Sequence, residues 1–184
     1  PEYVRCAFSS TPLEYRGNKK AWLLVGDHKG TKADMLQAVA MVEGPVMAAS
    51  KGAVRGGLVP KWMQAEGMGE IEVAPDLAKY GFGVVLFASG SRALILAEPP
   101  NDMWSKAGME AAVLEMWLLA YAWIVVVSEN STFWLPGVSF VRGMGGWGDK
   151  KRGEYVLTTS QRCYAMPTSE PVTDGGHRIR NMWQ

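Results

Sequence analysis

The chain has 184 residues, of which 48% are apolar, and this is enough to fill one substantial core. Its 19 basic and 18 acidic side chains give a formal net charge of +1, which excludes a global field that would recruit nucleic acid or an anionic membrane. Only two cysteines are present, too few for a disulfide framework, so we expect an intracellular, reducing compartment, with an organelle or a virion as settings.

The first quarter of the chain predicts two strands and a helix. Residues 3–9 alternate loosely and residues 21–25 are apolar, so we expect them to form a hairpin with a long loop. Thr31 is a suitable N-cap for a helix over residues 32–42, which ends before Gly44. The apolar positions of that helix share one face, as in a helix that covers a sheet.

The middle segment is the least regular part of the first half. Residues 46–69 are rich in Gly, Ala, Met and Lys, which favours either a short helix and loop or an arm that becomes ordered on a partner. Residues 70–73 alternate acidic and β-branched side chains, and this pattern predicts a strand with one wet face.

The second half begins with a clear hairpin signal. Residues 82–88 and 93–97 are apolar on both faces and flank a Ser-Gly-Ser turn, so they predict two central strands. A helix is expected from Met103, and it becomes apolar nearly all round apart from Glu115. The β-branched run at 123–127 then predicts another central strand.

The last part of the chain alternates expected strands with polar segments. Residues 132–140 and 154–160 predict strands on either side of a Gly-rich basic loop. Residues 167–184 contain Pro, Gly and charge without periodicity, so we expect an extended tail.

These elements predict an α+β fold: a mostly antiparallel sheet of hairpins with two main helices, in a single domain over residues 1–166. The segments 21–42 and 92–113 each read as a strand followed by a helix, which suggests an internal duplication with pseudo-repeats over about 1–75 and 76–160. Chance similarity of alanine-rich helices is the alternative. The matching helical positions are Lys32/Lys106, Ala33/Ala107, Met35/Met109, Ala38/Ala112 and Val39/Val113.

Residues 108–127 have the length of a membrane span, which leaves membrane contact open. Glu110 and Glu115 oppose a span because an acid within a bilayer is costly unless it is paired. A buried helix followed by a strand is the preferred interpretation.

The sequence contains no constellation of side chains that dictates a reaction. Asp27 and His28 follow one expected strand and Glu98 follows another, so a small-molecule pocket at these strand ends is the main enzymatic alternative. Cys6 and Cys163 lack the close spacing of metal ligands, and we expect them to be inert, with neither a metal nor a cofactor bound.

The basic loop at 142–152 matches G-x-G-x-x-G, but it leads into a strand and not into the helix N-terminus that holds a pyrophosphate. Its cations and Trp147 provide a third hypothesis, an RNA-associated protein.

We expect a non-catalytic interaction subunit of a larger protein assembly, of the viral-shell or organellar-complex type. The chain has eight Trp and eleven Met, residue types that suit contact surfaces. Partners would be other protein subunits, docked through the Gly/Met/Trp-rich segments and the tail. The expected interaction residues are Trp62, Met63, Trp147, Arg178, Arg180 and Trp183.

Overall fold

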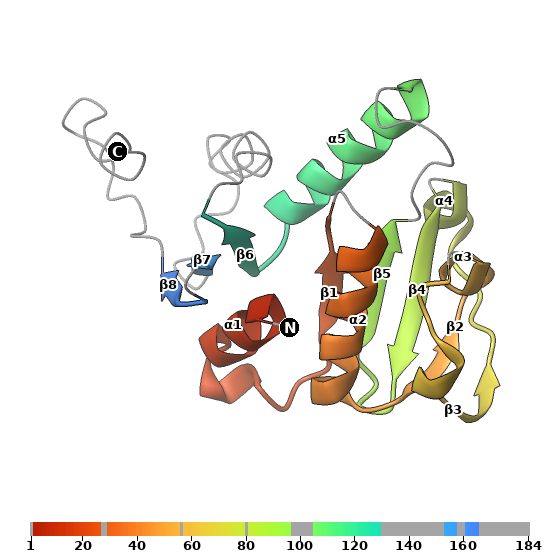
Figure 1. Ribbon diagram of the computed structural model, residues 1–184, viewed down its shortest axis with the longest axis horizontal. Helices are drawn as coiled ribbons and strands as arrows, with labels where there is room; N and C mark the ends of the chain where they lie inside the picture. Colours follow the sequence, from red (N-terminus) through yellow and green to blue (C-terminus); the bar gives the residue numbers. More distant parts are fainter. Residues whose placement is uncertain are drawn as a thin grey trace.

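The computed structural model describes residues 2–26, 29–55, 57–79, 81–96, 105–129, 153–157 and 161–165 (Figure 1). With 3-10 helices marked η, its elements are α1 (Glu2–Ser10), η1 (Leu13–Tyr15), β1 (Ala21–Leu24), α2 (Lys29–Glu43), β2 (Val46–Ala49), α3 (Lys51–Arg55), η2 (Lys61–Met63), β3 (Gln64–Gly69), α4 (Pro75–Lys79), β4 (Phe82–Phe87), β5 (Arg92–Leu96), α5 (Lys106–Ala120), β6 (Ile124–Ser128), β7 (Gly153–Leu157) and β8 (Cys163–Ala165).

The larger sheet has five strands in the order β1-β5-β4-β2-β3. The pairs β1–β5 and β2–β3 are parallel, whereas β4 runs antiparallel to both of its neighbours. The expected α+β class is therefore confirmed, but the sheet is mixed and not mostly antiparallel. The reason is that α2 carries the chain from β1 across the sheet to β2, and only β4 and β5 form a hairpin as expected.

The main core lies between this sheet and α2, which crosses one face of it in Figure 1. The apolar side of α2, including Leu36 and Val39, packs against strand residues such as Val85 and Ile95, and all four side chains are fully buried. Burial of this kind stabilises a fold by about 25 cal/mol per Å² of apolar surface. The two expected principal helices are thus present as α2 and α5.

A second sheet has the strand order β6-β7-β8, with β6 and β7 parallel and β7 and β8 antiparallel. Helix α1, from the other end of the chain, packs on β6 and β7. Cys6 of α1 and Cys163 of β8 form a disulfide with their Cα atoms 5.6 Å apart. The expectation of two inert thiols was therefore wrong, and the cross-link is at odds with the expected reducing compartment.

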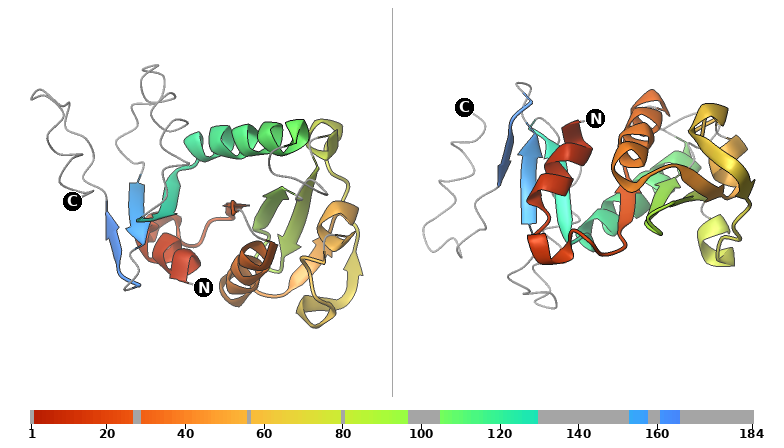
Figure 2. Two further views of the ribbon diagram at one scale, coloured as in Figure 1. Left: turned by 45° about the horizontal axis from the view of Figure 1, so that its top comes forward. Right: turned by 90° about the horizontal axis from the view of Figure 1, so that it is seen from below.

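Helix α5 joins the two sheets. It runs past the end of the larger sheet and delivers the chain to β6, as both Figure 1 and Figure 2 show. Within the described residues, no helix is both long enough and apolar enough to cross a membrane.

Several sequence-based boundaries were wrong, and each has a structural reason. Residues 3–9 form helix α1, so the opening hairpin does not exist. Residues 46–69 are not an arm, because β2 and β3 join the main sheet there. The strand expected at 70–73 lies earlier, at 64–69, and 70–74 is irregular. The strand expected to be central at 123–127 is β6, an edge strand of the small sheet.

The strand-helix units β1–α2 and β5–α5 begin on adjacent parallel strands, with Leu23 opposite Leu94. The internal duplication and the single-domain division remain predictions. The strand expected at 132–140 and the tail at 167–184 lie outside the described residues.

Candidate functional site

The outward side of α5 is the first candidate. The helix begins after Ser105, whose Oγ accepts a hydrogen bond from the amide of Gly108 at 3.1 Å. Its first turns carry an exposed ion pair, with Lys106 Nζ 3.9 Å from a carboxylate oxygen of Glu110. An exposed pair of this kind contributes little to stability, so the start of the helix is an ordinary solvated surface.

From Met109 onward the outward side of α5 is apolar apart from Glu110. Met109 is 58% exposed and Val113 is 49% exposed, and the four-residue spacing places them on the same side. Trp117 continues that side and is half-buried, and Tyr121 at the C-cap is exposed. The only charged side chain between Glu110 and Tyr121 is Glu115, which points inward and is buried. We call Met109, Val113, Trp117 and Tyr121 the α5 stripe.

A large aromatic side chain extends the apolar surface beyond α5. Trp123, just before β6, is exposed on one side and makes an edge-to-face contact with Tyr15 of η1, with ring centroids 5.3 Å apart. Such contacts hold aromatic rings in fixed orientations. Trp123 is therefore held in place while part of its surface remains available.

Trp62 and Met63 were both expected at an interaction surface, and the structure separates them. Trp62 in η2 is 68% exposed, whereas Met63 is 6% exposed and belongs to the main core cluster. Met63 is thus a packing residue with little surface to offer a partner. Its neighbour remains a surface side chain.

The second candidate is a buried ion pair where two parallel strands end. Lys32 Nζ lies 2.9 Å from Glu115 Oε1 and donates a second hydrogen bond to the carbonyl of Leu96 at 3.1 Å. Leu24 and Leu96 are the last residues of the adjacent strands β1 and β5. The carboxyl ends of parallel strands are where ligands often bind in α/β proteins. Here the two charged groups satisfy each other and join α2 to α5.

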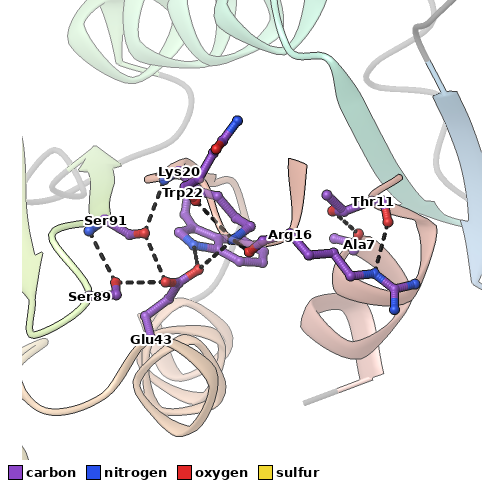
Figure 3. A network of polar contacts seen from close by, with 9 residues as sticks. Ala7, Thr11, Arg16, Lys20, Trp22, Glu43, Ser89 and Ser91 are labelled. Carbon is purple, nitrogen blue, oxygen red and sulfur yellow. Dashed lines mark hydrogen bonds and ion pairs between the residues drawn. The ribbon is translucent and has the colours of Figure 1, made fainter. Parts of the chain in front are cut away.

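The third candidate is the polar network around Glu43, shown in Figure 3. One carboxylate oxygen accepts from Trp22 Nε1 at 3.0 Å, and the other accepts from the hydroxyls of Ser89 at 2.7 Å and Ser91 at 2.8 Å. Lys20 Nζ adds an ion pair at 3.7 Å. Burial raises the pKa of the Glu43 carboxyl, but the hydrogen bonds from Ser89, Ser91 and Trp22 and the charge of Lys20 together lower it below its ordinary value.

The Glu43 network is built by the turns that surround it. Glu43 is the last residue of α2. Gly44 ends the helix with a φ of +87°, a backbone conformation that residues with a side chain rarely adopt. The β4–β5 turn presents Ser89 and Ser91, and the amide of Ser89 donates to the carbonyl of Glu43 at 3.0 Å. Every oxygen of the carboxylate is occupied by protein groups, so the network joins elements and is not an open catalytic site.

The remaining sequence-based site residues lie outside the described part of the chain. They are Asp27, His28, Glu98, Trp147, Arg178, Arg180 and Trp183. The basic loop at 142–152, on which the RNA hypothesis rests, also lies outside the described residues. Within the described ranges, no three His, Cys, Asp or Glu side chains gather closely enough to hold a metal ion.

Sequence reasoning missed both polar sites. Lys32 is a charged side chain in the first part of α2, and nothing in its neighbours in sequence indicates that it is buried. One signal was present, because Glu115 is a lone acid within an apolar run and a buried acid needs a partner. No comparable signal marks Glu43, since its partners come from segments far apart in the sequence.

The architecture defines an α+β protein with a mixed five-stranded sheet and a smaller sheet beside it. Comparisons with known protein families, with curated proteins and with solved structures find no match to this chain.

Proposed function

We propose that this protein is a non-catalytic interaction subunit of a larger protein assembly and that it docks through the α5 stripe. The observation that supports this most strongly is the exposure of Met109 and Val113 on a helix whose outward side, from Met109 onward, carries Glu110 as its one exposed charge among the described residues. Apolar side chains gathered on one face favour a protein partner, because contact removes them from water.

The composition of this surface agrees with the proposal. Trp, Tyr and Met are the residue types enriched where protein interfaces bury most of their area, and hot spots of binding energy are often aromatic. Trp117, Tyr121 and Trp123 supply aromatic side chains on or beside the α5 stripe. Trp62 provides a second contact point on η2.

The position of α5 also suits docking. The buried pair of Lys32 and Glu115 fixes the inward side of α5 to α2. The backbone of α5 therefore loses little conformational freedom when a partner binds its outward side. Preorganisation of this kind lowers the entropic cost of association. The segment 167–184, which lies outside the described residues, is expected to add contacts to the same partner.

The test is the native mass of the protein in a gentle extract of its source, measured by size-exclusion chromatography with mass detection. We expect elution far above 20 kDa with companions in fixed ratio. The double variant Met109→Glu, Val113→Glu should elute as the free chain, because two carboxylates would be desolvated at the contact. The matched control is Met41→Glu, an exposed methionine on α2. Elution of the unaltered protein as a free monomer would contradict the proposal.

A small-molecule enzyme or binder is the second candidate, and the ends of β1 and β5 support it. These strands are adjacent and parallel, and residues 27, 28 and 98 follow them closely in the chain. If this candidate is right, His28→Ala abolishes ligand binding or turnover and leaves the thermal midpoint nearly unchanged. In a ligand screen by thermal shift, equal responses of the parent protein and of His28→Ala would contradict this second candidate.

A further inference from the structure

In the described part of the chain, the small sheet contacts the rest of the molecule mainly through helix α1. The main core cluster draws its members from Val4 through Ile95 and includes no described residue of the small sheet. Among the described residues, α1 packs on β6 and β7, and Tyr15 contacts Trp123, the residue before β6. The disulfide between Cys6 and Cys163 is the single covalent cross-link of the chain.

The two cysteines of the disulfide differ in their exposure to solvent. Cys6 lies in α1 and is 3% exposed, whereas Cys163 lies at the exposed start of β8. The hydroxyl of Ser10 is 3.8 Å from the sulfur of Cys163. A reagent in solution therefore reaches the Cys163 side of the bond first.

We propose that the Cys6–Cys163 disulfide is a reversible redox clamp, which low-molecular-weight thiols open by attack at Cys163. Opening removes the covalent link between α1 and β8 and leaves β8 paired with β7. The main sheet stays folded because its core does not include the clamp. This device is independent of the docking role of α5.

The chemistry is thiol–disulfide exchange. The thiolate of a small thiol such as glutathione attacks the sulfur of Cys163, the bond between the two protein sulfurs breaks, and its electron pair leaves with Cys6, which takes a proton from water. A second thiolate attacks the mixed disulfide and releases the thiolate of Cys163. The protein disulfide gains two electrons, and the two small thiols lose them as they join in their own disulfide.

The site of attack follows from access, because exchange requires the incoming thiolate to reach one sulfur in line with the bond. The pairing of β8 with β7, on which α1 packs, keeps Cys6 near Cys163 after opening, so the Cys6 thiolate can attack the mixed disulfide at Cys163 and expel the small thiol. The clamp therefore closes again without a search through the unfolded chain.

The experiment uses the full-length oxidised protein in buffers of reduced and oxidised glutathione. Samples are quenched with acid, and the position of the glutathione adduct is mapped by peptide mass spectrometry. We expect the adduct on Cys163. In separate samples, hydrogen exchange of β7 and β8 should become at least roughly tenfold faster on reduction, while that of β4 and β5 stays unchanged.

Two variants provide matched controls. In Cys6→Ser the remaining thiol of Cys163 should react with an alkylating reagent under native conditions roughly tenfold faster than the remaining thiol of Cys6 does in Cys163→Ser. An adduct found on Cys6, reduction only at the rate of global unfolding, or equal exchange of β8 in the two redox states would each overturn the clamp. Circular dichroism of each variant verifies that the main fold is retained.

Discussion

The ammonium group of Lys32 lies 2.9 Å from the carboxylate of Glu115, and both side chains are buried where β1 and β5 end. The two residues are 83 positions apart in the chain, and their pairing holds α5 against α2. A buried pair costs desolvation energy that its mutual attraction only partly returns. Its structural effect is to fix the position of α5.

Removal of one partner of this pair should destabilise the protein strongly. We expect Lys32→Met to lower the free energy of unfolding by about 3–5 kcal/mol, because the Glu115 carboxylate then stays buried without its cation. Glu115→Leu should have an effect of similar size. Urea denaturation followed by circular dichroism gives both values.

The double variant Lys32→Met, Glu115→Leu tests the pairing itself. It should recover most of the stability that each single change removes, since no buried charge is left at this position. Strictly additive losses would show that the two residues act separately. Lys106→Met, which removes a cation from an exposed pair, is a control and should change stability by less than about 1 kcal/mol.

The Glu43 network predicts a specific pH dependence of stability. Because the pKa of Glu43 in the folded protein is lowered from the ordinary 4.5, ionised Glu43 adds stability above that ordinary value and loses it as the pH falls through the lower folded pKa. Glu43→Gln should therefore cost about 1–3 kcal/mol at neutral pH. The stability lost through Glu43→Gln should become smaller as the pH falls below the ordinary pKa of 4.5.

Unfolding free energies of the two proteins at several pH values test this dependence. Glu110→Gln, a change at an exposed surface pair, provides the baseline. A cost of Glu43→Gln that stayed constant from neutral pH into acid would mean that the charge of the carboxylate does not contribute.

The close approach of α3 to β4 predicts intolerance of a methyl group at Gly83. A Cβ built there would lie 2.8 Å from the backbone nitrogen of Ala53, which cannot move like a flexible side chain. Gly83→Ala should thus lower the unfolding free energy by about 1–3 kcal/mol. Gly69→Ala, where a Cβ meets nothing within 4 Å, should stay within about 0.5 kcal/mol of the parent. Equal effects of the two changes in thermal unfolding would disprove the close contact.

Trp62 and Met63 provide an adjacent pair with opposite environments. Met63→Ala should cost about 2–5 kcal/mol because it leaves a cavity in the core. Trp62→Ser should leave stability nearly unchanged and weaken association with the partner, as read from the chromatographic mass. A destabilising Trp62→Ser would show that the exposed indole packs within its own chain.

The apolar strands of the second half could be predicted because their signal is local. The Ser-Gly-Ser turn between two apolar runs indicates the β4–β5 hairpin, and the run up to Ala120 indicates α5. Both patterns depend on residues that are neighbours in sequence. The parallel pairing of β1 with β5 depends on α2 crossing the sheet, and no local sequence pattern predicts that crossing.

Helix α1 shows how a correct pattern leads to a wrong element. Val4 and Cys6 are both buried, which looks like the period of two of a strand. On a helix, residues two apart point to opposite sides. Val4 packs in the main core while Cys6 is joined to β8, so α1 is covered on both sides and two positions two residues apart are both buried.

The candidate site was predictable only in part. The excess of Trp and Met suggested contact surfaces, and this stays a prediction; Trp62 is exposed and so has surface to offer a partner. Whether a given Met or Trp is buried depends on tertiary packing, so the sequence alone does not distinguish the buried Met63 from the exposed Trp62. The polar networks of Glu43 and Glu115 combine residues from distant segments, so neither could be read from spacing alone.

The small sheet is completed by the two extremes of the described chain, and this sets an order on biosynthesis. The members of the main core lie between Val4 and Ile95, so the larger sheet can assemble while the ribosome is still adding later residues. Helix α1 is made before the strands that it packs on, because β6 begins at residue 124 and β7 at residue 153. The side of α1 that faces the small sheet therefore stays uncovered until more than 100 further residues have been added.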